Sequence, residues 1–200
     1  MQKKAIVLLA SGFEEIEAVT PIDVLRRAGV HVSIVGLGAQ TIAGAHGISL
    51  KADEVLDERL TVEVEKATRM LDMLVIPGGG PGADNLAASE LVARLVHAQA
   101  KAGRWIAAIC ASPAVVLAKT GVLNNRQVTC YPGYEDFFAK AAEITPRTER
   151  VIRDGSIITS RGPGTALEFA LELARVLAGD ATADKLTAGM LAMVESTVVA

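Results

Sequence analysis

Residues 5–35 read AIVLLASGFEEIEAVTPIDVLRRAGVHVSIV, and this stretch decides the fold. The apolar run at residues 5–9 predicts a strand that is buried on both faces. Residues 14–28 carry apolar side chains at spacings of three and four, which predicts an amphipathic helix. Pro21 lies inside this pattern, so a kink or a late start of the helix stays open. The alternating residues 30–35 predict a second strand.

The same alternation of strands and helices continues along the chain. Glycine-rich turns join the segments, and this order predicts a doubly wound, mostly parallel α/β sheet with helices on both faces. Residues 41–50 predict a hairpin or a bulged pair, whereas residues 53–69 have no clear pattern. Further strands are expected at residues 71–76 and 105–109 and in a hairpin of residues 151–152 with 157–159, and further helices at residues 89–102, 111–119, 164–177 and 181–194.

Composition limits the classes of function. The chain has 200 residues, half of them apolar, and a formal net charge of −3. These values are typical of one globular domain, residues 1–200. A sequence pI near 5.7 and 4% aromatic residues argue against a nucleic-acid-binding face. No apolar run reaches the length of a membrane span, and two cysteines make no disulfide framework, so a reducing, cytoplasmic location is expected.

Three loops follow predicted parallel strands, at the edge of the sheet where such proteins bind ligands. One loop is residues 11–17, the second is the run PGGGPG at residues 77–82, and the third begins at Cys110. We expect the three loops to converge on one crevice.

Cys110 is a candidate nucleophile. It follows an apolar strand and precedes the small residues Ala111 and Ser112, as a sharp strand-to-helix turn requires. A position at a helix N-terminus would favour the thiolate. A buried core cysteine is the alternative, and the placement alone leaves both interpretations open.

Three acids in the first loop are candidates for proton transfer. Glu14 and Glu17 are three residues apart and share a helix face, whereas Glu15 points elsewhere. A carboxyl beside a thiolate could share a proton with it and act as general acid or base. Acids are also favoured in a first helical turn by the helix dipole, and the residues alone favour this simpler explanation.

The remaining motifs are weaker. The PGGGPG run matches no nucleotide-binding pattern, and its N–H groups could either stabilise an oxyanion or merely form a tight turn. The three histidines have no metal-binding spacing, so no metal is expected. His31 and His97 are expected to be structural, and His46 stays a candidate for the pocket.

Four stretches carry a family signature. They are residues 8–29, 74–86, 106–118 and 156–173, which read LLASGFEEIEAVTPIDVLRRAG, LVIPGGGPGADNL, IAAICASPAVVLA and SIITSRGPGTALEFALEL. In these stretches the chain resembles the ThiJ/PfpI superfamily, and most closely the branch that contains the parkinsonism-associated protein deglycase and bacterial YajL. The resemblance implies a flavodoxin-like fold, similar to that of class I glutamine amidotransferases.

The resemblance also implies a site. Cys110 matches the family's reactive cysteine, and Glu17 matches a protonated glutamate that is hydrogen-bonded to it. Gly79 and Ala111 match the residues whose backbone N–H groups face the site. The pocket or the border of a homodimer interface is expected to include Glu14, Arg27, His46, Tyr131 and Pro163.

Two departures from the wider pattern narrow the expected activity. Ala111 stands where protease-like members have a histidine, and no histidine follows His97, so peptidase and amidotransferase activities are not expected. Tyr131 stands where close relatives often have a pocket histidine. Because a tyrosine is a poor base at neutral pH, Glu17 is left as the expected proton shuttle.

The resemblance implies a hydrolase or lyase with a cysteine nucleophile and no cofactor. Its expected substrates are small dicarbonyls such as methylglyoxal or their adducts, which makes it a glyoxalase or deglycase with a role in oxidative-stress protection. The alternative is a redox-sensing chaperone whose Cys110 is oxidised to the sulfinate. A second copy of the chain is the expected protein partner, and no membrane or nucleic acid is expected.

Overall fold

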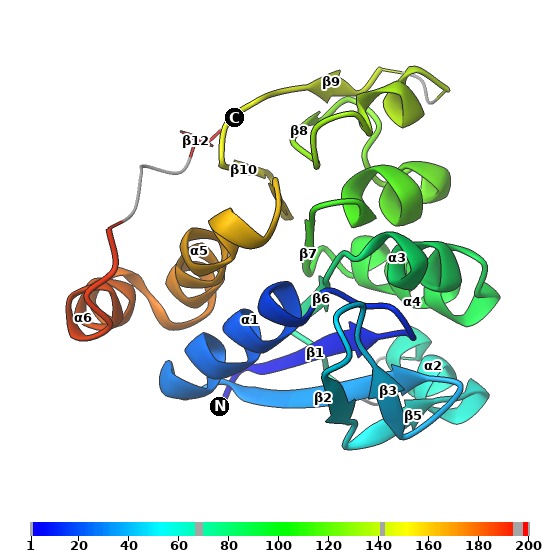
Figure 1. Cartoon of the computed structure of the whole chain (residues 1–200), viewed down its shortest axis with the longest axis horizontal. Coiled ribbons are helices and arrows are strands. Elements are labelled where there is room, and N and C mark those ends of the chain that lie inside the picture. The colour runs from blue at the N-terminus through cyan, green and yellow to red at the C-terminus, as the bar shows by residue number, and fades with distance from the viewer. Residues whose placement is uncertain (1, 67–69, 141–142, 194–197, 200) are drawn as a thin grey trace.

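A computed structural model describes residues 2–66, 70–140, 143–193 and 198–199. Helices cover both faces of a central sheet, as Figure 1 shows. Within the described residues the sheet has eight strands in the order β12-β10-β11-β7-β6-β1-β2-β5, and only the β10–β11 pair is antiparallel. The strands are β1 (Lys4–Leu9), β2 (His31–Leu37), β5 (Glu54–Leu56), β6 (Met73–Ile76), β7 (Trp105–Ile109), β10 (Val151–Asp154), β11 (Ile157–Ser160) and β12 (Val198–Val199). The predicted α/β class is confirmed.

The first strand–helix–strand unit forms as its sequence indicates. All of β1 after Lys4 is buried, and β1 pairs in parallel with both β2 and β6. Helix α1 (Glu15–Arg27) begins before Pro21, so the late start left open above is excluded. Glu14 is the N-cap of α1, and its carboxylate accepts the Glu17 N–H at 2.7 Å.

The helices lie in two layers. Helix α1 packs on α5 (Ala166–Ala178) on one face of the sheet, and α6 (Asp180–Gly189) extends from α5. On the other face, α4 (Glu90–Lys101) packs on β6 and β7 and contacts α2 (Glu58–Glu65) and α3 (Gly80–Ala87), as seen in Figure 1. Helix α6 is shorter than the predicted 181–194, and residue 194 lies outside the described residues.

Two other segments differ from prediction. The helix expected at residues 111–119 is instead a π-helix, η1 (Pro113–Leu117), followed by a 3₁₀ turn, η2 (Ala118–Thr120). Ala118 N–H donates to the carbonyl of Pro113, five residues back, and side-chain patterns carry no signal for such a turn. The unclear residues 53–69 contain β5 and α2, although residues 67–69 lie outside the described chain.

Two predicted hairpins and two short elements complete the description. Strands β3 (Thr41–Ala43) and β4 (Ser49–Lys51) form the hairpin expected at residues 41–50, and β10 with β11 forms the other. The sequence patterns missed the pairing of β8 (Gln127–Val128) with β9 (Thr145–Pro146), as well as a 3₁₀ segment, η3 (Glu135–Lys140). Among the described helices, none combines the length and apolar character that crossing a membrane requires.

Candidate active site

Hydrogen bonds connect the three loops that follow β1, β6 and β7. Glu14 N–H donates to the Gly78 carbonyl at 3.0 Å, and Gly82 N–H donates to the Gly12 carbonyl at 3.2 Å. The Ser112 hydroxyl donates to the Pro77 carbonyl at 2.6 Å. The loops after β1, β6 and β7 therefore converge, as the sequence predicts.

Cys110 is held in a strained turn at the end of β7. Its φ is +66°, in the left-handed region that non-glycine residues rarely adopt. Its N–H donates to the Ser160 carbonyl at 3.0 Å, and its carbonyl accepts the Tyr131 N–H at 2.8 Å. The strained turn expected for a nucleophile is thus present, fixed by neighbours on both sides.

Glu17 lies beside Cys110 in the interior. Its side chain is fully buried and hydrogen-bonded to Cys110, and its Oε2 accepts the Gly78 N–H at 2.8 Å. Burial raises the pKa of Glu17 to about 7, and the charge of Glu14 acts in the same direction. Oε1 of Glu17 is buried without a hydrogen-bond partner among the described atoms, which leaves an acceptor for a bound molecule.

The thiol of Cys110 differs from expectation. Burial raises its pKa to about 12, and Glu17 adds to this effect, whereas the N–H groups of Gly79 and Ala111 lower it. The direction is opposite to that expected from a helix N-terminus, because burial and the neighbouring Glu17 outweigh the two N–H groups.

The two groups are coupled, because a negative charge on either one raises the pKa of the other. When Glu17 is ionised, its negative charge opposes formation of the thiolate. When Glu17 carries the proton, that repulsion is removed, and the Gly79 and Ala111 N–H groups remain to stabilise a sulfur anion. A proton on Glu17 therefore favours the Cys110 thiolate relative to the state in which Glu17 is ionised.

Gly78 makes this contact possible. A Cβ atom on residue 78 would lie 2.6 Å from the Cys110 Cβ and 2.6 Å from the Glu17 Oε2. No side chain fits between the two groups, so only glycine allows their approach. The glycine run was expected either to supply N–H donors or to form a tight turn, and its steric role was not predicted.

Tyr131 and Pro163 lie at the rim of the site. Besides donating its N–H to Cys110, Tyr131 places its ring against Gly162, where a Cβ would lie 3.1 Å from the ring. The Tyr131 side chain is 44% exposed. Pro163 follows Gly162 and begins the 3₁₀ turn η4 (Pro163–Thr165).

Glu15 positions His46 and not the cysteine. Its Oε1 accepts the His46 N–H at 2.6 Å, and its Oε2 lies 2.7 Å from His46 Nδ1. Burial tends to raise the pKa of Glu15, but the bonds to His46 outweigh burial and lower it, and the same contact raises the pKa of His46. Donor atoms of Glu14, Glu15 and His46 lie within 4.8 Å of one another. Both Glu15 oxygens are already engaged, which disfavours a metal ion there.

Arg27 is not brought to this site within one chain. It lies at the far end of α1, ten residues after Glu17, or about 15 Å along the helix axis. Its exposed side chain donates to Asp23 at 2.6 Å. Its expected place at a dimer border stays a prediction.

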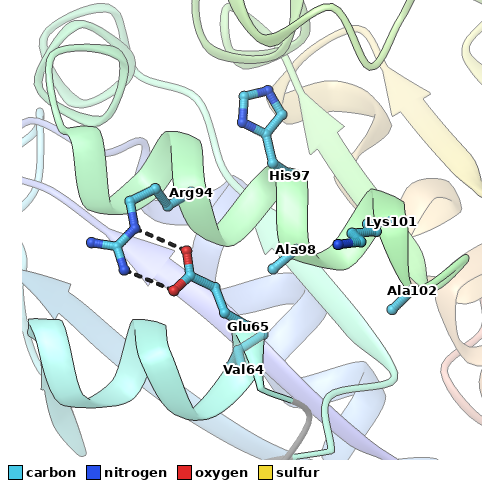
Figure 2. Close-up of a pocket in the computed structure, with 7 residues that line it drawn as sticks. All are labelled: Val64, Glu65, Arg94, His97, Ala98, Lys101 and Ala102. Atoms are coloured by element: carbon cyan, nitrogen blue, oxygen red, sulfur yellow. Dashed lines mark hydrogen bonds and ion pairs between the residues drawn. The ribbon is translucent and has the colours of Figure 1, made fainter.

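Figure 2 shows a different pocket, of about 600 Å³, between α2 and α4. Arg94 there binds both carboxylate oxygens of Glu65, at 2.9 and 2.7 Å, and also Glu58. Its cation is therefore already neutralised. The pocket contains none of the predicted site residues; it is lined by Val64, Glu65, Arg94, His97, Ala98, Lys101 and Ala102.

The fold and the site together define a class: doubly wound α/β proteins with a strained cysteine after a central strand and a buried glutamate in contact with it. The family model described as DJ-1/PfpI family matches residues 3–176, and the chain belongs to this family.

Individual relatives match over nearly the full length of both chains. Protein dj-1beta of Drosophila melanogaster is 39% identical over 193 residues, 96% of this chain and 98% of that protein. The crystal structure of Drosophila melanogaster DJ-1beta has a TM-score of 0.87 and 37% identity, with 97% and 100% of the two chains covered. Glutathione-independent glyoxalase DJR-1.2 of Caenorhabditis elegans is 37% identical, with 89% of this chain and 90% of that protein covered.

Proposed function

We propose that this protein is a cysteine-dependent, cofactor-independent glyoxalase or deglycase that acts on methylglyoxal-type dicarbonyls or their adducts. The observation that carries the proposal is the strained Cys110 in hydrogen-bond contact with Glu17, a buried carboxyl whose pKa is raised to about 7. A group with this pKa exchanges protons readily at neutral pH. Similarity to a relative named as a glutathione-independent glyoxalase supports the same activity.

The first step forms a covalent adduct. The Cys110 sulfur bonds to the aldehyde carbon while Glu17 gives its proton to the aldehyde oxygen, which yields a hemithioacetal. The N–H groups of Gly79 and Ala111 face the sulfur and are well placed to stabilise charge on the neighbouring oxygen.

The second step moves hydrogen between two adjacent carbons. The Glu17 carboxylate removes the proton from the former aldehyde carbon and returns it to the neighbouring ketone carbon, while the hydroxyl proton of the hemithioacetal passes to the ketone oxygen. The first carbon is thereby oxidised to a thioester and the second reduced to an alcohol, so no external oxidant or reductant is required. Water then cleaves the thioester, which releases the Cys110 thiol and a hydroxy acid; methylglyoxal gives lactate.

The proposal is tested by measuring lactate formed from methylglyoxal. Cys110→Ser should lose activity by at least about 100-fold, because no other group can form the adduct. Cys130→Ser is the matched control, since Cys130 is also a buried free cysteine and should retain activity. Equal turnover by the wild type and Cys110→Ser would refute the proposal. The same proteins incubated with a preformed methylglyoxal adduct measure deglycation.

The second candidate is a redox sensor with chaperone activity, which would use the same cysteine. Cys110 is 9% exposed whereas Cys130 is fully buried, and this difference favours oxidation at Cys110. Intact mass after mild peroxide treatment distinguishes the candidates. Addition of two oxygens to Cys110, in a protein that converts no dicarbonyl, would favour the sensor.

A further inference from the structure

Three aromatic side chains form a continuous cluster beside the cysteine, which we call the aromatic wall: Tyr131, Tyr134 and Phe137. The rings of Tyr131 and Tyr134 have their centroids 6.2 Å apart in an edge-to-face arrangement. The rings of Tyr134 and Phe137 are stacked at 5.7 Å. The N–H of Tyr134 donates to the Tyr131 carbonyl and that of Phe137 to the Tyr134 carbonyl, each at 3.1 Å, so the backbone fixes the spacing of the rings.

The wall adjoins the reacting groups. Tyr131 N–H is bonded to the Cys110 carbonyl, and the Tyr131 ring lies against Gly162. A Cβ placed on Gly162 would be 3.1 Å from that ring and 4.0 Å from Glu17 Oε1, the buried acceptor without a partner. Gly162 therefore lies between an aromatic ring and the unpaired carboxyl oxygen, and its lack of a side chain allows the ring to approach this oxygen.

A second glycine leaves room along the wall. A Cβ on Gly80 would lie 3.6 Å from the Tyr134 hydroxyl, and Gly80 directly follows Gly79, whose N–H faces the Cys110 sulfur. Tyr131 and Phe137 are 44% and 41% exposed, so part of each residue is open to solvent. Unlike most exposed aromatics, they gather at one place next to an unsatisfied buried acceptor.

Two acids, Glu135 and Asp136, lie between Tyr134 and Phe137 in the sequence. Glu135 is the one whose carboxylate has contacts within the described part of the fold. Its Oε2 accepts the Gly133 N–H at 2.6 Å, and its Oε1 lies 3.9 Å from Arg161. The Glu135 carboxylate is thus partly compensated, and the solvent-exposed parts of the Tyr131 and Phe137 rings offer apolar surface to a bound group.

We propose that the aromatic wall selects the substituent of the substrate, and that the site prefers α-oxoaldehydes carrying an aromatic ring to those carrying a methyl group. The inference rests on the proposed function and deepens it. An aryl group bound to the reacting carbonyl carbons can pack edge-to-face or offset-stacked on the wall, whereas a methyl group makes few such contacts.

The test compares initial rates with phenylglyoxal, which gives mandelate, and with methylglyoxal. The wild type should have the higher kcat/KM for phenylglyoxal. Tyr131→Ala should lower the ratio of kcat/KM for phenylglyoxal to kcat/KM for methylglyoxal by about threefold to tenfold, the range expected for one aromatic contact. Tyr131→Phe keeps the ring without the hydroxyl and should keep the ratio, and Phe137→Ala should lower it less than Tyr131→Ala. Val55→Ala, a truncation of an exposed apolar residue on β5, is the control.

A binding measurement separates failure of the inference from failure of the proposed function. Mandelate and lactate are titrated by calorimetry into Cys110→Ala, with and without the additional change Tyr131→Ala. Turnover with an unchanged ratio in Tyr131→Ala would overturn the wall and leave the glyoxalase proposal intact. If the wild type turns over neither dicarbonyl, the proposed function fails. In that case the proposed role of the aromatic wall is supported only if mandelate binds more tightly than lactate and Tyr131→Ala removes the difference. Equal binding, or a difference that Tyr131→Ala leaves unchanged, would overturn this role.

Discussion

At the residue scale, the central feature is a buried carboxyl that shares its proton with a thiol. Glu17 is fully buried, and among the described residues it contacts Cys110 and accepts the Gly78 N–H. Because burial penalises the charged form, the carboxyl retains its proton to a pH at which ordinary glutamates are ionised. Ionisation of the buried carboxyl at higher pH therefore lowers the stability of the fold.

The stability of the protein should therefore depend on pH through Glu17. Its pKa rises from 4.5 in an unperturbed glutamate to about 7 in the fold. The neutral carboxyl gives its full stabilisation below the lower value, and that stabilisation is lost as the pH rises through the higher one. Glu17→Gln stays neutral, so its advantage over the wild type in free energy of unfolding should grow to as much as about 3 kcal/mol between pH ~5 and ~8.

Denaturant unfolding at several pH values measures this difference. Glu90→Gln, which changes an exposed acid at the start of α4, should show no such growth over the same range. A Glu17→Gln advantage that is constant with pH would contradict a raised pKa for Glu17.

His46 gives an independent check on the charges near the site. Its pKa is raised by the hydrogen bond to Glu15 and by the charge of that carboxylate. In Glu15→Gln both effects are lost, and the His46 pKa should fall towards about 6.5. An NMR titration follows the imidazole directly, with His97 as the internal control, since its Nε2 faces the Thr120 carbonyl. A His46 titration unchanged by the substitution would mean that the pair is not formed.

Residue types reveal candidates for the site more readily than they reveal proton affinities. Position made Cys110 a candidate, only the family resemblance favoured Glu17, and the structure brings the two side chains together. The direction of the Cys110 pKa was predicted wrongly, because burial and the proximity of Glu17 depend on the assembled fold. The steric role of Gly78 was missed for the same reason, because it depends on the positions of Cys110 and Glu17 around it in the folded chain.

At the element scale, the glycine loop between β6 and α3 keeps the thiol and carboxyl together. Gly78→Ala would place a methyl group 2.6 Å from both Cys110 Cβ and Glu17 Oε2, so the groups must move apart. We expect a loss of about 1–3 kcal/mol in the free energy of unfolding, together with reduced turnover.

The matched control is Gly189→Ala, at the end of α6, where a Cβ would meet nothing within 4 Å. It should be neutral or slightly stabilising, since alanine is the better helix former. Thermal unfolding of both variants measures the contrast. If Gly78→Ala is as stable and as active as Gly189→Ala, the close packing described around residue 78 is wrong.

Regular elements follow from local pattern, whereas irregular ones do not. The apolar spacing around β1, α1 and β2 predicts these elements directly: a continuous apolar run or alternation for the strands, and spacings of three and four for the helix. Helix α2 carries an N-cap, with Asp57 accepting the Leu60 N–H at 2.8 Å, but its eight residues are too few for a clear period. The π-helix after Cys110 depends on packing against the loop, through contacts such as that of Ser112 with Pro77.

At the scale of the whole molecule, we propose a homodimer. Ile16 and Val19 on α1 are 55% and 43% exposed, and they lie three residues apart on one helix face. The expected dimer border also includes Arg27 of this helix. Light scattering should give about 42 kDa, twice the 20.9 kDa of one chain. A species of about 21 kDa across the micromolar range would refute the dimer.

The most direct test of the account is the pH dependence of Cys110 alkylation in the wild type and in Glu17→Gln, read by intact mass in a Cys130→Ser background. A shared proton predicts that the wild-type rate shows an inflection near pH 7, where Glu17 titrates, in addition to the ionisation of the thiol. In Glu17→Gln the inflection near pH 7 should disappear, leaving a single titration with a shifted midpoint. Superimposable curves for the two proteins would show that Cys110 and Glu17 titrate independently, and would contradict the account.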